Sequence, residues 1–442
     1  MPTVNVAEII DRQKVGAFQL RTFCLCLAVL FADGFDVQGI TYVAPAISQE
    51  WSLARGALGP TFSAGLFGVM LGAILIAPLA DRVGRRPIII ASCVAFGTCT
   101  LLTVWVGSLS ALLVLRFFTG LGLGAAIPNS IALASEYAPK RWRATTVTFV
   151  SSGISLGAIA AGVAAAQLIG TLGWRAVFVV GGALPLALAA ALWRWLPESI
   201  RFAALIPAGQ ALAARLLRKI APDLDAGARI ESGDAGAGRA TVRDLFKERR
   251  GGATVLLWVA FFMSLLNVYL AINWLPTSLN ASGFSVAEAA VITTMYHVGG
   301  LAGTYALGLL MDRLGTHAML IASLCLAAAG FYTFAMAPGM SEAATIVVLM
   351  ATGFGVIGGQ AGLNTIASML YPVAMRSTGL GWALGVGRVG SVVGPTVGGL
   401  MLATGLDARH VYLVCIVPAL MGAAMIALLR MQAGPAPQPL RA

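Results

Sequence analysis

Long hydrophobic stretches, separated by short polar segments, run along almost the whole chain. Twelve of them are long enough to cross a bilayer core about 30 Å thick, which takes roughly 20 apolar residues per helix. The expected spans are residues 20–47, 57–80, 87–107, 109–136, 145–169, 174–196, 252–275, 287–311, 318–337, 342–370, 376–403 and 409–430. The pattern therefore predicts an all-α membrane protein with twelve transmembrane helices.

The basic residues are concentrated in every second loop between these spans. Of the 29 Lys and Arg residues, 24 lie in one set of loops and ends, and the opposite set holds only Arg55, Arg175 and Arg409. Because basic loops stay on the cytoplasmic side, both termini are expected in the cytoplasm, with the chain in the cell inner membrane. The polar segment up to Arg21 does not have the pattern of a cleaved signal peptide, so none is expected.

The composition supports this interpretation. The chain is 58% hydrophobic and 11% charged, whereas soluble proteins are about 25% charged. The net charge of +11 then reflects membrane topology, and no nucleic-acid partner is expected. All six cysteines fall in apolar stretches, and no metal-ligand spacing accompanies them. We expect no metal site, no cofactor and no enzymatic activity.

One long polar segment separates six spans from the other six. It covers residues 200–251, with an amphipathic piece at 211–220 and a flexible run expected at 226–240. The expected organisation is an N-terminal half at 1–199, a cytoplasmic linker at 200–251 and a C-terminal half at 252–442. The linker has no recognisable motif for a protein partner.

The two halves repeat each other. Three motifs recur in the same order and at nearly the same separation along the chain: Leu79–Gly84 with Leu310–Gly315, Asn129–Ala132 with Asn364–Ala367, and Arg143–Thr145 with Arg376–Thr378. The separation corresponds to six spans, an even number, which keeps both copies in the same orientation, so the repeats are parallel. Parallel six-helix repeats are typical of major facilitator transporters, with the substrate between the halves and alternating access by rocking.

The motifs also carry a resemblance to a known family. Asp81-Arg82-Val83-Gly84-Arg85-Arg86 resembles the loop signature of the major facilitator superfamily, and the second copy has Thr316 and His317 in place of the basic pair. The chain is similar to the aromatic acid:H+ symporter family through these further segments: Asp33–Asp36, Arg116–Gly124 with Pro128–Asn129, Ser135–Tyr137, Leu196–Ser199, Asn273–Pro276 and Gly385–Gly390.

The resemblance implies a symporter that imports a small aromatic carboxylate with protons, of the benzoate, hydroxybenzoate or phenylpropanoate type. Two alternatives stay open at this point. One is an efflux antiporter of the same fold, whose Gly-Pro motif is absent from the fifth span. The other is a receptor that binds an aromatic acid without transporting it.

Four charged residues lie well inside predicted spans: Asp33, Asp36, Arg116 and Arg388. Each would cost roughly 2.5 to 3.5 kcal/mol at a helix centre if unpaired, so they should face one another or a watered cavity. The spacing of Asp33 and Asp36 places both on one face of the first span. With Arg116 they are candidates for proton coupling, and the alternative is a static ion pair.

Arg388 lies among glycines, where its planar guanidinium could bind a substrate carboxylate or pair with an acid of the first span. Other polar and aromatic residues in the spans could line the cavity or make ordinary contacts between helices. The substrate-binding candidates beside Arg388 are Asn129, Asn273, Trp274, Tyr296, His297, Gln360 and Asn364, and Asn267, Tyr269 and Trp382 are further cavity candidates. His297 could also titrate near neutral pH.

The repeated loop motif contributes a third group of candidates. Asp81, Arg82, Arg85 and Arg86, with Asp312 and Arg313 in the second copy, lie at the cytoplasmic ends of spans. Charges there can pair in one conformation and separate in another, which suggests a gate. Topology alone would explain the arginines but not the repeated aspartate.

Overall fold

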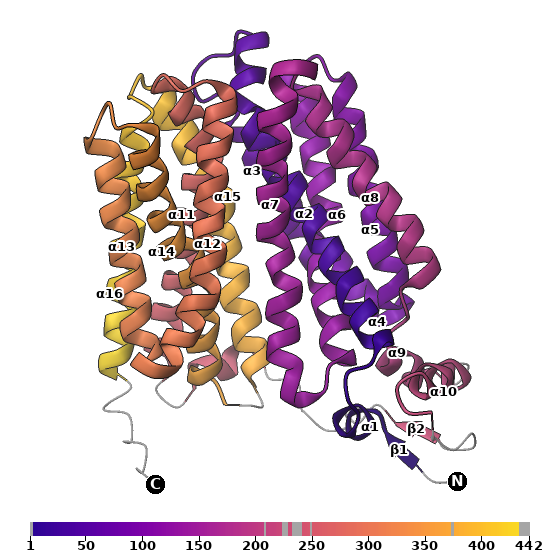
Figure 1. Cartoon of the computed structure of the whole chain (residues 1–442). Helices are drawn as coiled ribbons and strands as arrows, with labels where there is room; N and C mark the ends of the chain where they lie inside the picture. The colour runs from indigo at the N-terminus through magenta and orange to yellow at the C-terminus, as the bar shows by residue number, and fades with distance from the viewer. Residues whose placement is uncertain are drawn as a thin grey trace. The chain divides into compact units, whose positions relative to one another are not determined.

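The computed structural model describes residues 3–206, 209–222, 229–231, 241–247, 250–372 and 375–432, and most of them are helical (Figure 1). The chain forms two compact units. Unit 1 comprises Met1–Val43 and Ala64–Ala237, and unit 2 comprises Ala44–Ser63 and Gly238–Ala442. The division between residues 237 and 238 falls inside the segment expected as a linker, and the boundaries at 199 and 252 stay predictions.

Unit 1 is built from the first six spans. Its long helices are α2 (Ala17–Glu50), which continues into unit 2, the span from α3 (Gly59–Leu71) to α4 (Ala80–Val83), α5 (Arg85–Leu102), α6 (Leu109–Tyr137), α7 (Arg143–Leu172) and α8 (Arg175–Trp195). Between α3 and α4 the chain makes a π-helical turn at Gly72–Ile76 and a 3-10 turn at Ala77–Leu79. Pro78 lacks the N–H that a regular helix needs there, yet the span continues through Val83.

Unit 2 contains the remaining six long helices and the segment Ala44–Ser63, which comprises the end of α2, the chain after it and the first residues of α3. The helices are α11 (Gly251–Ala281), α12 (Val286–Leu314), α13 (Thr316–Met336), α14 (Glu342–Leu370), α15 (Arg376–Ala403) and α16 (His410–Gln432). A short 3-10 turn at Val242–Phe246 precedes α11. All twelve predicted spans correspond to long helical segments, and their ends lie within a few residues of the expected limits for most.

Eleven segments among the described residues are long and apolar enough to cross a membrane. The twelfth span is α12, whose 29 residues suffice in length. Its composition is more polar because it carries Thr293, Thr294, Tyr296 and His297. The twelve-helix membrane architecture predicted from the sequence is confirmed.

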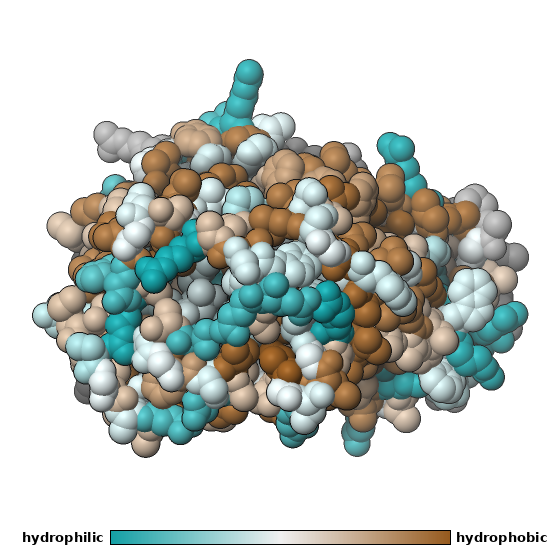
Figure 2. All heavy atoms as spheres, turned by 90° about the horizontal axis from the view of Figure 1, so that it is seen from above, coloured by the Kyte–Doolittle hydropathy of each residue, from teal (hydrophilic) through white to brown (hydrophobic). Residues whose placement is uncertain are grey.

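The surfaces of the helices are apolar. Large hydrophobic side chains lie largely exposed, among them Trp105, Leu172, Trp193, Leu309 and Val347, which are 66% to 73% accessible. Such exposure suits a hydrocarbon surrounding, where lipid contacts these side chains. Figure 2 looks onto the end of the molecule away from the two short strands, where hydrophilic residues are interspersed with hydrophobic ones.

The same close helix packing occurs in both units. A Cβ added to Gly120 in α6 would overlap the carbonyl oxygen of Gly65 in α3, and one added to Gly353 in α14 would overlap that of Tyr296 in α12. A second pair of contacts shows the same repeat. A Cβ on Gly157 would overlap the carbonyl oxygen of Phe31, and one on Gly390 would overlap that of Phe262. Gly120 and Gly353 are as far apart in sequence as Gly157 and Gly390. The internal repeat is therefore present in the packing as well as in the sequence.

These contacts fix which residues of α6 and α14 are equivalent. Ser108 is the N-cap of α6, and Ser341 is the N-cap of α14. These two serines are as far apart in sequence as Gly120 and Gly353. The same shift takes Asn129 to Gly362 and not to Asn364. The predicted equivalence of Asn129 and Asn364 was therefore two positions out of register. The sequence match between the two Asn-containing segments therefore does not correspond to the structural equivalence of α6 and α14.

A small subdomain outside the spans completes unit 1. It contains α1 (Val6–Arg12), α9 (Ile200–Leu205) and α10 (Gln210–Arg218), and the strands β1 (Thr3–Asn5) and β2 (Arg229–Glu231) pair in parallel, Thr3 with Arg229. Apolar residues of α1, α9 and α10 belong to the core of unit 1. The amphipathic piece was predicted close to α10, whereas β2 lies inside the run expected to be flexible, most of which is outside the described residues.

Candidate functional site

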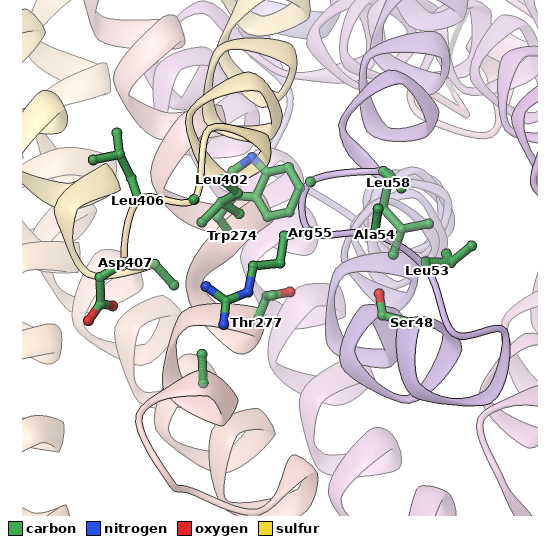
Figure 3. A pocket seen from close by; sticks show the side chains of 15 residues that line it. Ser48, Leu53, Ala54, Arg55, Leu58, Trp274, Thr277, Leu402, Leu406 and Asp407 are labelled. Atoms are coloured by element: carbon green, nitrogen blue, oxygen red, sulfur yellow. The ribbon is translucent and has the colours of Figure 1, made fainter.

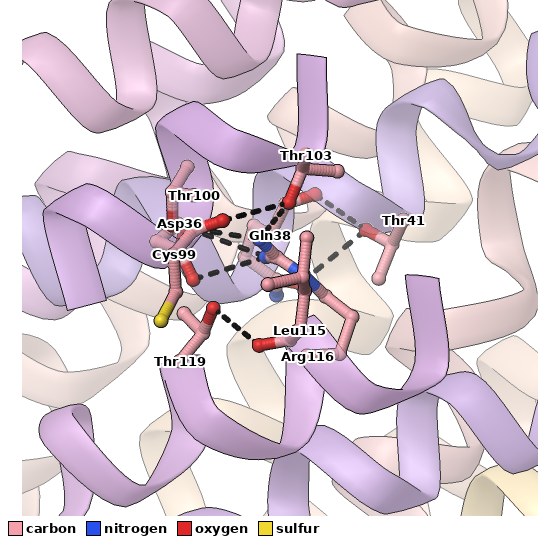
Figure 4. Close-up of polar contacts among 9 residues, drawn as sticks. All are labelled: Asp36, Gln38, Thr41, Cys99, Thr100, Thr103, Leu115, Arg116 and Thr119. Atoms are coloured by element: carbon pink, nitrogen blue, oxygen red, sulfur yellow. Dashed lines mark hydrogen bonds and ion pairs between the residues drawn. The ribbon is translucent and has the colours of Figure 1, made fainter. Parts of the chain in front are cut away.

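The centre of unit 1 contains a buried ion pair (Figure 4). Arg116 in α6 and Asp36 in α2 are 3% and 4% exposed. The guanidinium Nη1 of Arg116 lies 3.3 Å from Oδ2 and 3.4 Å from Oδ1 of Asp36. Asp33, one helical turn before Asp36, is equally buried at 3%. Three of the predicted intramembrane charges thus lie in one unit, and Arg116 and Asp36 are in direct contact.

Two threonines that the sequence analysis missed complete this cluster. Thr103 accepts a hydrogen bond from Nη2 of Arg116 at 3.0 Å, and Thr100 accepts one at 3.4 Å. Thr100 also donates its hydroxyl hydrogen to Asp36. The ring of Phe178 in α8 lies 5.2 Å from the guanidinium carbon, close enough for a cation–π contact. The pair is therefore held by side chains from α8 and from the end of α5.

Glycines bring α2 and α7 close together near this cluster. A Cβ on Gly34 would overlap the main-chain carbonyl of Ile154 in α7. Gly181 in α8 leaves room for the ring of Phe35. Small residues at helix crossings let backbones approach closely in membrane proteins. The Asp33-Gly34-Phe35-Asp36 segment therefore combines its two carboxylates with a packing position between them.

Two of the predicted gating residues, Arg85 and Arg86, are the first residues of α5. Arg85 forms an ion pair with Glu136, the penultimate residue of α6. The main-chain N–H groups of Arg85 and Arg86 donate to Oε1 of Glu198 at 2.8 and 3.2 Å. Glu198 thus caps the start of α5 from the segment after α8, and a carboxylate is favourable at a helix N-terminus.

Further contacts hold these acids in place. Ser199 donates to Oε2 of Glu136 at 2.5 Å, and the hydroxyl of Tyr137 donates to the main-chain oxygen of Glu198 at 2.6 Å. Arg86 donates to the main-chain oxygen of Trp193 and lies 5.6 Å from the Trp193 ring centre. Glu136 and Glu198 belong to the motifs quoted above, but their partnership with Arg85 requires the folded chain.

The other gating candidates lie on the surface of their units. Asp81, Arg82, Asp312 and Arg313 are all exposed. The two copies of the loop end alike, because Gly84 and Gly315 both adopt positive φ, 103° and 91°, before the next helix. Positive φ costs glycine little, which explains the repeated glycine. The repeated aspartates stay predicted gating residues.

In unit 2 the intramembrane arginine contacts a tyrosine. The Nη1 atom of Arg388 in α15 lies 3.5 Å from the hydroxyl of Tyr269 in α11, and Arg388 is half-buried. Asn273, one turn after Tyr269, donates to the main-chain oxygen of Tyr269 at 2.7 Å. The guanidinium therefore keeps donors that can bind an anion.

A second polar contact in unit 2 joins α11 and α14. Ser264 donates to Oε1 of Gln360 at 2.6 Å. Asn267 lies one turn further along α11 and donates to the main-chain oxygen of Cys415 at 2.9 Å. The shift along the chain that takes Phe31 of α2 to Phe262 of α11 also takes Asp36 to Asn267. The charged cluster of unit 1 thus has a neutral counterpart in unit 2.

The remaining candidates occupy different environments. Tyr296 and His297 are 1% and 3% exposed, with ring centres 5.8 Å apart, and the main chain of Tyr296 packs on α14. Asn129 is buried and donates to the main-chain oxygens of Ala125 and Ala77 at 2.9 and 3.3 Å. Asn364 is exposed. Asn129 therefore serves a packing contact in this structure.

Both predicted tryptophans have well-defined neighbours. Trp274 is 2% exposed, its indole N–H donates to the main-chain oxygen of Pro395 at 3.0 Å, and its ring meets that of Phe62 edge to face at 5.4 Å. Trp382 is 46% exposed and stacks on Trp258 at 5.9 Å. Of these two tryptophans, Trp274 is the one in the interior of unit 2.

Comparison with known proteins gives relatives along almost the entire chain. A 4-hydroxybenzoate transporter of Pseudomonas putida is 37% identical, with 94% of each chain covered, and a gallate transporter of the same organism is 36% identical over 96% of this chain and 94% of its own. A solved structure of a bacterial homologue of the human lysosomal transporter Spinster, inward-facing and occupied, aligns with a TM-score of 0.75 at 18% identity. It covers 95% of this chain and 98% of that one.

The sequence profile of the Major Facilitator Superfamily matches residues 26–249 and 257–442. This match spans both units and includes all or most of every long helix. Together with the twelve spans and their internal repeat, it identifies a multi-pass membrane transporter rather than an enzyme. The chain belongs to the major facilitator superfamily.

Proposed function

We propose that the protein is a symporter that imports a small aromatic carboxylate together with protons across the inner membrane. The substrate class follows from its relatives, which are named as 4-hydroxybenzoate and gallate transporters. The observation that carries the coupling is the buried contact between Asp36 and Arg116. The proton gradient is the driving force, with both termini in the cytoplasm and no cofactor.

Asp36 is the proton-binding group in this proposal. As a carboxylate it balances Arg116, and protonation removes that charge while Thr100 and Thr103 still bind the guanidinium. Arg116 then attracts another anion, either the Asp33 carboxylate or the substrate. Proton binding thereby changes the electrostatics at the centre of unit 1, and it biases the rocking of the halves that exposes the substrate alternately to each side.

Arg388 is the substrate anchor. Its guanidinium offers a planar fork that matches a carboxylate, and its contact with Tyr269 at 3.5 Å is long enough to be exchanged for a substrate oxygen. The Ser264–Gln360 contact supplies polar groups of the same unit that can bind ring hydroxyls. Tyr296, His297 and Asn273 are further candidates for lining the site.

Uptake into proteoliposomes with an imposed pH gradient tests the proposal. Labelled benzoate, 4-hydroxybenzoate, gallate and a phenylpropanoate should show which substrate is concentrated against its gradient. Asp36→Asn should abolish uphill uptake, whereas Asp11→Asn, which changes a carboxylate outside the spans, should leave it intact.

Three results would contradict the proposal. Proton-driven export of the acid indicates an antiporter, and binding without flux indicates a receptor. Uphill uptake that survives in Asp36→Asn removes Asp36 from coupling, and the same result in Asp33→Asn removes Asp33.

A further inference from the structure

Unit 2 contains a cavity of about 310 Å³ at the end opposite the C-terminal end of α16. Its walls are the chain between α2 and α3, the last turns of α11 and the loop between α15 and α16 (Figure 3). A volume of roughly 300 Å³ is at the lower limit for small-molecule pockets. The cavity therefore suits a single-ring ligand.

Arg55 supplies a cation to this cavity. It lies on the segment between α2 and α3, and its side chain extends between Trp274 and Thr277 (Figure 3). Within the part of the chain that the structure describes, no hydrogen bond or ion pair of Arg55 is found. Its guanidinium is thus available to an anion.

Arg55 shares its set of loops with two other basic residues, Arg175 and Arg409, and both of these form contacts. Arg175 in unit 1 donates to the main-chain oxygen of Val104 at 3.2 Å and lies 4.3 Å from the Trp174 ring centre. Arg409 in unit 2 donates to the hydroxyl of Ser282 at 3.0 Å. Of the three arginines, Arg55 is the one whose guanidinium enters this cavity.

Trp274 forms part of the cavity wall through a ring that is 2% exposed and already fixed in orientation. Its indole N–H is bound to Pro395 and its ring is held by Phe62, so binding of a ligand need not order it. Leu58, Leu402 and Leu406 add apolar surface, and Thr277, one turn after Trp274 on α11, adds a hydroxyl. Preorganised groups favour binding because little conformational entropy is lost.

We propose that this cavity is an entry site for the transported aromatic carboxylate, separate from Arg388. Arg55 binds the carboxylate, and the aromatic ring of the ligand packs against the apolar wall formed by the leucines and the small exposed part of Trp274. Asp407 is on the opposite wall, its carboxylate is turned away, and its Oδ1 accepts the N–H of Arg409 at 3.0 Å. The inference rests on the proposed import of an aromatic acid and adds a second binding step on the side from which substrate arrives.

Uptake kinetics of single-residue variants test the entry site. Arg55→Gln should raise KM about three- to tenfold, the loss expected for one charge-assisted contact at an exposed position. The maximal rate of uptake should stay unchanged, because the proposed substrate site at Arg388 is intact. Arg55→Lys should give an intermediate KM, since an ammonium keeps the charge but lacks the fork.

Two controls distinguish a binding site from a general effect of charge. Arg409→Gln removes the same charge from a residue outside the cavity wall, and it should leave KM within about twofold of the wild type, as expected for an engaged surface charge. Asp407→Asn should leave KM unchanged or lower it, because a negative charge near the site opposes an anion.

The inference is overturned by an unchanged KM in Arg55→Gln, or by an equal rise in Arg409→Gln, which would indicate general attraction of anions. It is also overturned if Asp407→Asn raises KM like Arg55→Gln, because Arg55 and Asp407 would then act as a gating pair. Each of these results requires a wild type that concentrates the acid. Failure of the proposed function is distinct, since the wild type itself would then show no uphill uptake.

Discussion

The ion pair between Asp36 and Arg116 should be energetically coupled, and a double-mutant cycle can measure this. Removing one partner of a buried pair leaves a charge in an apolar surrounding and costs roughly 3 to 5 kcal/mol. Thr100, Thr103 and the ring of Phe178 still contact Arg116 when Asp36 is replaced. We therefore expect Asp36→Asn to cost about 3 kcal/mol, at the lower end of that range.

Thermal unfolding of the purified protein in detergent provides the assay. For a unit of this size, 1 kcal/mol shifts Tm by about 2 to 4 °C, so Asp36→Asn should lower Tm by about 6 to 12 °C. Arg116→Met should lower it at least as much, because Asp36 then remains buried without its cation. The double variant should be more stable than either single variant, since neither charge of this pair is then left buried without the other.

The exposed pair of Lys247 and Asp244 is the matched control. Its atoms are closer, at 2.7 Å, but the Lys247 side chain is 69% exposed. Solvent screening makes such pairs weak, and the corresponding cycle should show a coupling below about 1 kcal/mol, well short of that of the buried pair. If the Tm losses of Asp36→Asn and Arg116→Met simply add in the double variant, the two residues are independent and the coupling argument fails.

The remaining predictions concern packing, capping and protonation. Gly34→Ala should prevent normal folding, because its Cβ would overlap the Ile154 carbonyl. Gly308→Ala is the control and should be neutral or stabilising, because the space around its Cβ is open. Expression level and Tm distinguish the two variants, and normal folding of Gly34→Ala would contradict the packing. Glu198→Ala should cost about 1 to 2 kcal/mol by removing the carboxylate that accepts from the first two N–H groups of α5, measured as a lower Tm. An unchanged Tm would show that water replaces this carboxylate. The pKa of Asp244 lies well below its usual range because the Lys247 side chain and the Thr241 N–H donate to it. Because the pKa is depressed in the folded state, ionised Asp244 contributes fully to stability above its unfolded pKa, and this contribution is lost as the pH falls through the folded pKa. An NMR titration of Asp244 should therefore show no protonation near pH 4.

The spans were predictable because a bilayer requires long apolar helices, and the repeat was visible in three motifs. Register was harder to predict. Asn129 and Asn364 look equivalent in sequence, but the glycine contacts between helices make Gly362 the equivalent of Asn129. Identical side chains can recur by chance, whereas backbone contact distances constrain a register directly.

The site was predictable in part for a similar reason. A charge inside a span is costly there, so Asp36 and Arg116 stand out in the sequence as candidate functional residues. Thr100 and Thr103 are ordinary residues in a membrane helix, and only the fold shows that they bind Arg116. The two threonines, one turn apart at the end of α5, were the available signal. Trp274 was a candidate from the sequence, but its contacts with Phe62 and Pro395 could not be predicted, because they join segments that are distant along the chain.

The parallel pairing of β1 with β2 sets an order for assembly during synthesis. Thr3 pairs with Arg229, so the strand that is made first has no partner until all six helices of the first half have been made. Contacts between residues so distant in sequence form late. The small sheet can therefore form only after the six helices of the first half have been made, and it joins residues 3–5 to the segment that leads into the second half.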